Sequence, residues 1–549
     1  MPRRKTLPTL VEICLKCYGK HFIWSLLKLP ISKHKNCDGD EKNSIAERRD
    51  SLLKMARAYV LEYTIMRTRK ELLKVFIGEI LDMKSSQYWE ILRDCLVVIG
   101  GEWIQELDFI CDMLDYMVPI EIDQPELILS QTLFQNHSWS ESLVSLKLPD
   151  LRDFEIVKAV GSHCYNLQYL DISTSFQTGP GVGHATCLMY LYGAVENSMG
   201  CPKLKTIALP LWRRNLEVID HVVKMIQFMP DLQVIRNVDT RLVAIKYMNA
   251  MNQLCPMKLT EFEEWEKDTF REDEYNEVNE ALGKLFPNVK RYASFCWYYG
   301  YLPIFRDQGL VKMQSNFTCL QVIEFYKYNG DLIEDINSMD SMPSVKVFKL
   351  YERDDIVGFE KVNALSAVFP NLEKLVLHSE CYCVDNGDDL LEQTIFSKLN
   401  TLELNKVAEL DVRFLQIFFE KCPVLRTLEL FCVDPSYFQE APLITDEFVQ
   451  SLSSSMVSLE KVTIARDPRN LPCTFPLSLS TSLGCIRLML TYASILRILH
   501  NCPNLRVLGD LGFWSVTNEQ IYMLNAYIAQ NNWDLTLVNN SSAECGYLS

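Results

Sequence analysis

Two short stretches of the sequence combine residue types that could bind phosphate or metal. Residues 179–183 read Gly-Pro-Gly-Val-Gly and follow an expected strand, which is where a phosphate-binding loop would lie. Farther along the chain, His378, Cys381 and Cys383 stand close together and carry side chains of the kind that ligate zinc. Both stretches could therefore do chemistry, and each must be judged by the residues around it.

Neither stretch has the residues that would complete its chemistry. The glycine loop lacks the Lys-Ser/Thr pair of a phosphate-binding loop, and Pro180 removes an amide donor. It also falls in the longest interval of the repeat described below, which favours an extended loop. No second ligand pair stands at structural-zinc spacing from Cys383, so a loop with buried thiols is favoured there. We expect a non-enzymatic protein with no catalytic residue, no metal and no cofactor.

Composition and charge narrow the classes of partner. The chain has 549 residues, 48% of them hydrophobic and 23% charged, which is typical of globular proteins. Its formal net charge of −16 disfavours nucleic acid, and no apolar stretch is long enough to span a membrane. Glu12 and Lys16 interrupt the apolar segment behind the basic start, which argues against a secretory leader. The 19 scattered cysteines fit a reducing compartment, so we expect a cytoplasmic or nuclear protein, or both.

An internal repeat, Leu-x-x-Leu-x-Leu, organises most of the sequence. It recurs from residue 143 to residue 505 with a mean period of about 28 residues, within the range of leucine-rich repeats. Its most regular copies start at Leu320, Val345, Leu372, Leu399 and Leu425. Weaker copies start at Leu232, Leu259, Val289, Ile486 and Leu505. So regular a template predicts one strand per repeat, with repeats stacked on a continuous core.

The segments between the expected strands indicate helices. Prolines such as Pro343, Pro370 and Pro423 stand two residues before the first apolar position, where they end a helix and turn the chain into the next strand. Phe414, Ile417 and Phe418 have helical spacing, and Thr445 is placed to cap a helix that begins with acidic residues. The predicted fold class is therefore α/β, a curved leucine-rich-repeat solenoid with a parallel concave sheet and helices on its convex side.

The predicted organisation has three parts. Residues 1–33 form a helical box, residues 44–120 a helical capping region, and residues 130–540 the solenoid. A polar linker, His34 to Asn43, separates the first two. Helical spacing in the capping region is seen in Leu52, Met55 and Tyr59, and again in Leu72, Phe76 and Ile80. The capping region would cover the apolar face of the first repeat.

The N-terminal box is the most informative segment for function. Thr9 and Glu12 form a capping box that begins a helix, and Leu10, Ile13, Cys14 and Cys17 then share one face. A helix that only packs against the capping region would have the same apolar face, so a packing role remains the alternative. A second apolar helix follows Gly19 and stops at Leu29-Pro30.

These residues resemble the elongin-binding box of cullin–RING ubiquitin ligase receptors. Thr9, Leu10 and Cys14 match its pattern, whereas Tyr18 is aromatic where that family has an aliphatic residue. Leu29-Pro30 is similar to the start of the following cullin-selecting segment, and Lys33 departs from it. An F-box is also a short N-terminal helical module that binds an adaptor, so it is a variant of the same hypothesis. The Cys-Pro-x-Leu repeats at Cys422 and Cys502 resemble those of F-box-type substrate receptors. The resemblance implies an adaptor of elongin or F-box type bound through Leu10, Ile13, Cys14, Cys17, Leu29 and Pro30, together with a cullin.

A second binding surface follows from strand alternation. The third, fifth and seventh positions of the repeat face the concave side of the predicted sheet. They carry aromatic side chains flanked by both signs of charge, which suits a protein partner better than a merely solvated face. The predicted substrate-binding residues are Tyr326, Lys349, Tyr351, Lys374, His378, Glu403, Glu429 and Phe431.

Two further clusters leave alternatives open. Residues 295–301 read Phe-Cys-Trp-Tyr-Tyr-Gly-Tyr and could belong to the core or to the rim of the sheet. The acidic run that includes Glu261, Glu263 and Glu264 is typical of a solvated helix, and a dock for a basic partner is the alternative.

The function predicted from these features is substrate recognition within a cullin–RING E3 ubiquitin ligase. The repeats would bind a protein substrate and the N-terminal helices an adaptor, with no nucleic acid or membrane involved. The alternative is a leucine-rich-repeat interaction scaffold with no role in ubiquitination.

Overall fold

The computed structural model describes most of the repeat region and part of the N-terminal region. The described residues are 21, 39–64, 66–81, 94–96, 98, 104–108, 140–148, 155–173, 185–196, 198–210, 216–251, 255–265, 281–295, 309–328, 332–352, 356–384, 396–432, 444–452, 456–466 and 488–539. They fall into two compact units, one before Glu264 and one from Glu264 onward. The boundary lies within a single strand, β6.

The described strands form three sheets, and the pairings from β1 to β5, within β10-β12-β14 and from β7 to β18 are parallel. The first unit has a five-stranded sheet in the order β1-β2-β3-β4-β5. Its strands are β1 (Glu106–Asp108), β2 (Ser145–Lys147), β3 (Tyr169–Asp171), β4 (Thr206–Ala208) and β5 (Val234–Arg236). A small sheet, β10-β12-β14, consists of β10 (Ile356–Gly358), β12 (Cys381–Cys383) and β14 (Glu409–Leu410).

The largest sheet runs in the order β18-β17-β16-β15-β13-β11-β9-β8-β7-β6. Its strands are β6 (Glu261–Trp265), β7 (Arg291–Phe295), β8 (Val322–Tyr328), β9 (Val347–Glu352), β11 (Lys374–His378), β13 (Thr401–Val407), β15 (Thr427–Cys432), β16 (Lys461–Arg466), β17 (Val507–Gly509) and β18 (Thr536–Leu537). The copies that start at Leu259, Val289, Leu320, Val345, Leu372, Leu399, Leu425, Leu459 and Leu505 therefore each supply one strand. The prediction of a copy at Ile486 is wrong for this sheet, because β16 pairs directly with β17 and Leu488 and Met489 form only isolated bridges.

Equivalent repeat positions pair with one another across this sheet. The fourth positions of successive copies form one row: Tyr292, Ile323, Phe348, Leu375, Leu402, Leu428, Val462 and Leu508. All of these side chains are buried, and so are Leu372 and Leu377 at the first and sixth positions. Because strand side chains alternate, one face of the sheet carries these apolar positions and the other carries positions three, five and seven. The strand and core predictions for these repeats are confirmed.

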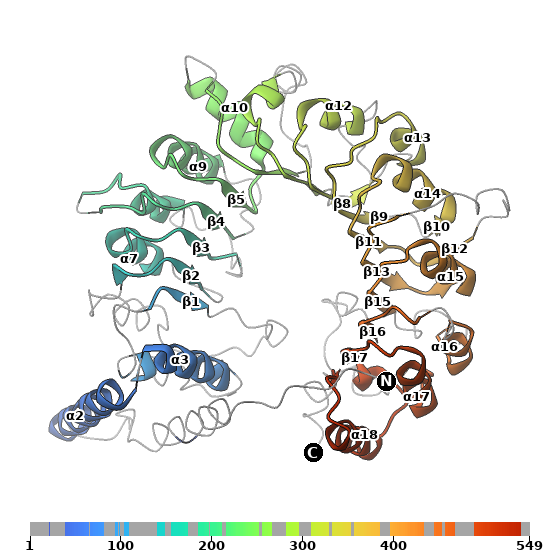
Figure 1. Cartoon of the computed structure of the whole chain (residues 1–549). Coiled ribbons are helices and arrows are strands. Elements are labelled where there is room, and N and C mark those ends of the chain that lie inside the picture. The colour runs from blue at the N-terminus through green and yellow to red at the C-terminus, as the bar shows by residue number, and fades with distance from the viewer. Residues whose placement is uncertain are drawn as a thin grey trace. The chain divides into compact units, whose positions relative to one another are not determined.

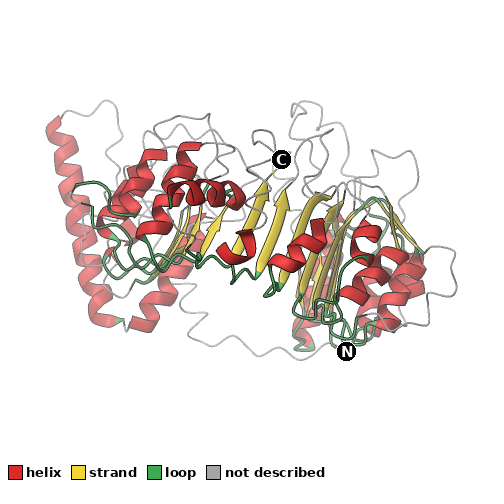
Figure 2. Cartoon of the chain, turned by 90° about the horizontal axis from the view of Figure 1, so that it is seen from above, coloured by secondary structure: helices red, strands yellow, loops and turns green. Residues whose placement is uncertain are grey.

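Helices connect the strands and cover the apolar face. Figure 1 shows α12–α16 on one side of β8–β15, and Figure 2, seen from above, shows strands side by side with helices next to them. The helices are α2 (Gly39–Tyr63), α3 (Met66–Leu81), α7 (Glu155–His163), α8 (Leu188–Leu191), α9 (Leu216–Phe228), α10 (Thr240–Ala250), α12 (Gly309–Asn316), α13 (Leu332–Asn337), α14 (Phe359–Val368), α15 (Val412–Lys421), α16 (Asp446–Leu452), α17 (Tyr492–Asn501) and α18 (Asn518–Gln530), with single turns of 3-10 helix at Ala185–Cys187 and Leu511–Phe513.

The predicted helix signals are found where the sequence placed them. Phe414, Ile417 and Phe418 of α15 are buried. Thr445 precedes α16, and its hydroxyl accepts a hydrogen bond of 3.4 Å from the Phe448 amide. Such a contact satisfies one of the amides that the first turn of a helix leaves unpaired.

The N-terminal region differs from its prediction in three places. Helix α2 begins at Gly39, so part of the predicted linker is helical. Residues 106–108, predicted as helical, form strand β1, which pairs with β2 through Leu107 and Leu146. On α2, Leu52, Met55 and Tyr59 are exposed, and Leu53 and Val60 are buried instead. The helical prediction for α3 is confirmed, with Leu72 and Phe76 buried.

A buried ion pair explains the orientation of α2. The Arg49 guanidinium contacts the Asp94 carboxylate, with an Nε to Oδ2 distance of 2.9 Å, and both side chains are almost fully buried. A charge so deeply buried requires a partner, so the face of α2 that carries Arg49 must pack inward. The apolar spacing of Leu52, Met55 and Tyr59 could not reveal this contact.

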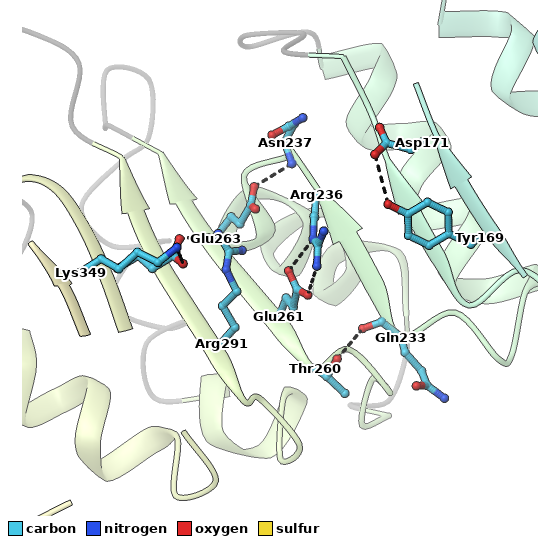
Figure 3. Close-up of polar contacts among 11 residues, drawn as sticks. Tyr169, Asp171, Gln233, Arg236, Asn237, Thr260, Glu261, Glu263, Arg291 and Lys349 are labelled. Atoms are coloured by element: carbon cyan, nitrogen blue, oxygen red, sulfur yellow. Dashed lines mark hydrogen bonds and ion pairs between the residues drawn. The ribbon is translucent and has the colours of Figure 1, made fainter. Parts of the chain in front are cut away.

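The described part of the acidic run, from Glu261 to Glu264, is a strand and not a solvated helix. Glu261, Glu263 and Glu264 all lie in β6 and are buried. The Arg236 guanidinium donates two hydrogen bonds to Glu261, of 3.0 and 2.8 Å, and the backbone N–H of Asn237 donates one of 2.7 Å to Glu263 (Figure 3). These donors compensate the loss of water, which is why carboxylates can occupy a buried strand.

We predict that Leu402→Ala lowers the free energy of unfolding by about 2–5 kcal/mol, because it leaves a cavity in the apolar row. The measurement is a urea melt followed by tryptophan fluorescence. Leu496→Ala on α17, where the side chain is 48% exposed, is the control and should cost far less. Equal losses in the two variants would contradict the burial of the row.

Candidate protein-binding face

The candidate site is the sheet face formed by positions three, five and seven of the repeats from β6 to β16, which we call the open face. It carries all eight predicted substrate-binding residues. Tyr326 lies on β8, Lys349 and Tyr351 on β9, Lys374 and His378 on β11, Glu403 on β13, and Glu429 and Phe431 on β15. Parallel pairing aligns them, with Tyr326 opposite Tyr351, Tyr351 opposite His378, and Glu403 opposite Glu429.

Position seven forms a continuous aromatic row across five strands. In strand order it consists of Trp265, Phe295, Tyr326, Tyr351 and His378. The ring centroids of the first three pairs lie 4.8, 4.4 and 4.4 Å apart with planes within 22° of parallel, and the His378 ring is tilted at 5.6 Å from Tyr351. The spacing follows from the separation of neighbouring strands, which is ~4.8 Å.

Glu324 is the centre of the charged part of this face. Its side chain is only 4% exposed and forms ion pairs with Arg291 at 2.7 Å and Lys349 at 2.8 Å. Burial alone would raise the pKa of the Glu324 carboxyl, but the hydrogen bonds and charges of Arg291 and Lys349 outweigh burial and hold it below its ordinary value. Glu324 is therefore ionised at neutral pH.

The aromatic row and the charges are in contact. The Tyr326 hydroxyl lies 3.4 Å from Glu324 Oε2 and can donate to it. Burial, followed by the nearby Glu324 charge, raises the pKa of the Tyr326 hydroxyl, so it remains a hydrogen-bond donor.

Ion pairs continue along the face toward β16. Lys374 pairs with Glu403 at 2.9 Å, and the Asn405 side chain donates a hydrogen bond of 3.0 Å to the same carboxylate. Lys461 on β16 pairs with Glu429. All three carboxylates of positions three and five on strands β7–β16 are therefore engaged by cations within the sheet.

The His378, Cys381 and Cys383 motif is divided between two sheets. His378 belongs to the open face, whereas the cysteines lie in β12, a strand and not the loop we predicted. Burial, followed by a hydrogen bond to Glu409, raises the pKa of the Cys381 thiol to about 12, so the thiol stays protonated at neutral pH. Within the described ranges, no three His, Cys, Asp or Glu side chains are grouped so that they could hold a metal ion.

Several expected features lie outside the described residues. These are the predicted adaptor-binding residues Leu10, Ile13, Cys14, Cys17, Leu29 and Pro30, and the glycine loop at 179–183. Of the aromatic cluster at 295–301, Phe295 alone is described.

Among the residues of the open face that sequence reasoning missed are Trp265, Phe295 and Arg291. Trp265 is position seven of the weak copy that starts at Leu259. Phe295 and Arg291 are positions seven and three of the weak copy that starts at Val289. Extending the template through those copies would have placed all three on the same face.

In the described part of the chain, no helix is both long enough and apolar enough to cross a membrane. The sequence matches no protein-family model and no curated protein. Among solved structures, a crystal structure of a complex of Rad7 and Elc1 in yeast has a similar chain. The match covers 98% of this chain and 100% of that one, at 12% identity and a TM-score of 0.35. A similarity at this score does not establish a shared fold.

We predict that Glu324→Gln destabilises the protein near neutral pH, by on the order of 1–3 kcal/mol, because Arg291 and Lys349 lose a charged acceptor. The folded-state pKa of Glu324 is depressed, so its contribution is fully present above the unfolded value of about 4.3 and is lost as the pH falls through the folded value. The measurement is the difference in free energy of unfolding between the two proteins as the pH is lowered.

The control is Glu373→Gln, which removes an exposed ion pair with Lys346. An exposed pair contributes about 0–1 kcal/mol, so this variant should change little. A Glu324→Gln effect that stays constant from neutral pH to strong acid would contradict the assigned role of the carboxylate.

Proposed function

We propose that the chain is the substrate-recognition subunit of a cullin–RING E3 ubiquitin ligase, and that its repeats form a leucine-rich-repeat solenoid. The open face would bind a protein substrate, and the N-terminal helices would bind an elongin-type or F-box-type adaptor and, with it, a cullin. The protein itself would carry out no chemistry. The observation that carries the binding half of the proposal is the aromatic row of the open face, bordered by charge.

The composition of this face supports protein binding. Half-buried tyrosines and a phenylalanine stand in consecutive strands, and aromatic residues are enriched among the side chains that dominate binding energy. The ion pairs beside them hold the surface in one arrangement, which reduces the entropy lost on binding. The in-register repeats also support the proposed solenoid, because each repeat buries its apolar side chains against the neighbouring repeats.

The adaptor half of the proposal rests on the sequence of residues 8–30. The capped helix predicted from Thr9 places Leu10 and Cys14 on one face, as in the family that it resembles. The rival function, a scaffold with no link to ubiquitin, would share the open face but would have no adaptor. Adaptor binding therefore separates the two.

We predict that Tyr351→Ala combined with Phe431→Ala reduces co-purification of substrate proteins, because an interface anchor can contribute ~2 kcal/mol or more. Loss of the Tyr326–Tyr351 stack should cost about 0.5–1.5 kcal/mol of stability, so the fold should persist. The measurement is quantitative affinity purification, accompanied by a thermal melt.

Tyr522→Ala combined with Tyr527→Ala provides a matched control, since both side chains are exposed on α18. This control should leave co-purification unchanged. A melting temperature that collapses together with binding in the Tyr351 and Phe431 variant would mean that these rings serve the core.

We predict that Leu10→Ser weakens adaptor binding by at least about tenfold. Burying a leucine contributes about 1.5–3 kcal/mol, and each factor of ten corresponds to ~1.4 kcal/mol. The readouts are recovery of elongin or F-box adaptors with the tagged full chain, and ubiquitination of a co-purified substrate. The variant should still bind substrate. Unchanged adaptor recovery, or no adaptor with the unmodified chain, would favour the scaffold function.

A further inference from the structure

The stacking of the aromatic row determines which part of each ring a partner can reach. Phe295 lies between Trp265 and Tyr326, and Tyr326 lies between Phe295 and Tyr351. Tyr351 in turn has Tyr326 on one side and the tilted His378 ring on the other. The two faces of each of these three rings are therefore turned toward neighbouring rings. A molecule approaching the open face meets ring edges and the Tyr326 and Tyr351 hydroxyls.

Ring edges and ring faces attract opposite charges. The face of an aromatic ring carries the negative part of its quadrupole and the edge carries the positive part. A lysine, arginine or methylammonium group binds over a ring face, within about 6 Å of the centroid. Because neighbouring rings occupy those faces, the middle of the row is poorly suited to a basic ligand and better suited to oxygen atoms with negative charge.

The charged side chains beside the row also favour a negatively charged ligand. Positions three and five of β7, β8, β9 and β11 carry three cations, Arg291, Lys349 and Lys374, and one carboxylate, Glu324. On β6 the same positions carry Glu261 and Glu263, which are buried and already accept hydrogen bonds from Arg236 and from the Asn237 backbone amide. Glu324 already bridges Arg291 and Lys349, and Lys374 pairs with Glu403 on the next strand. An ammonium group has three donors, and among the described residues Lys349 and Lys374 each make one ion pair. Their remaining donors can bind an additional acceptor, since the two side chains are 28% and 34% exposed, whereas Glu324 is 4% exposed and is already contacted by Arg291, Lys349 and the Tyr326 hydroxyl.

We propose that the aromatic row and its flanking lysines bind an acidic segment of the substrate protein, with Asp or Glu carboxylates accepting hydrogen bonds from Lys349 and Lys374. This inference rests on the proposed function, because it names the substrate class for the same face. The net charge of −16 opposes approach of such a segment at long range. Screening limits that repulsion to ~8–10 Å at physiological ionic strength, so short-range pairing at the lysines decides the preference.

The first test is selection from a library of random short peptides with the purified full chain. Acidic residues should be enriched in the selected peptides relative to the input library. Enrichment of Lys and Arg, or no preference for charge, would overturn the inference.

The second test places the site. A fluorescein-labelled peptide from the selection should bind Lys349→Gln combined with Lys374→Gln at least about tenfold more weakly than the unmodified chain. Lys346→Gln is the matched control, because Lys346 also forms an ion pair with a glutamate, Glu373, but precedes β9 and lies outside positions three, five and seven. It should bind the peptide normally, and an equal loss would overturn the location.

Lys349→Arg combined with Lys374→Arg keeps both charges and should retain most of the binding. It separates lost recognition from lost folding, which thermal melts of each variant also report. Failure of this variant to bind, with an unchanged melt, would overturn a role for charge.

Adaptor recovery measured on the same variants separates this inference from the proposed function. If acidic peptides bind but the chain recovers no adaptor, the receptor role is contradicted and the preference for acidic segments is supported. A chain that recovers adaptor and substrate but selects no acidic peptide would end the acidic preference alone.

Discussion

The parallel pairing of equivalent repeat positions is the constraint on which the rest of this structure depends. A strand turns alternate side chains to opposite faces, so a shift of one residue in pairing would move every leucine of a repeat to the wrong side. Leu375 opposite Leu402, and Leu402 opposite Leu428, show that the register is kept from one repeat to the next. The same register brings Tyr326 opposite Tyr351. Packing of the core and alignment of the candidate face are thus two results of one geometry.

The electrostatics of the open face follow from this alignment. Glu324 is buried on a face that carries polar side chains, because cations on the strands to either side reach it. It also lies within reach of the Tyr326 hydroxyl, which joins the charged rows to the aromatic row. A surface held by such contacts loses little conformational freedom when it binds, and this favours a defined partner over a promiscuous one.

The sequence predicted the strands, the buried row and the open face wherever the template was intact, as in the copies that start at Leu320, Val345, Leu372, Leu399 and Leu425. It failed where a distant partner decides the outcome. The glutamates of β6 are buried because Arg236 and Asn237 reach two of them and the Tyr292 hydroxyl donates to Glu264 at 2.7 Å. The inward face of α2 is chosen by Asp94, 45 residues beyond Arg49. No local periodicity encodes contacts of this kind.

The stacked row has a consequence for how its positions can vary during evolution. Replacing Tyr326 with a small residue would uncover a face of Phe295 and a face of Tyr351, whereas replacing Trp265 would uncover one face of Phe295. Side chains in contact also have non-additive effects, so the outcome of one substitution depends on which residues its neighbours already are. Drift should therefore begin at the two ends of the row and proceed inward. In the middle, a change from one aromatic residue to another should be tolerated more readily than its loss, and substitutions on adjacent strands should accumulate together.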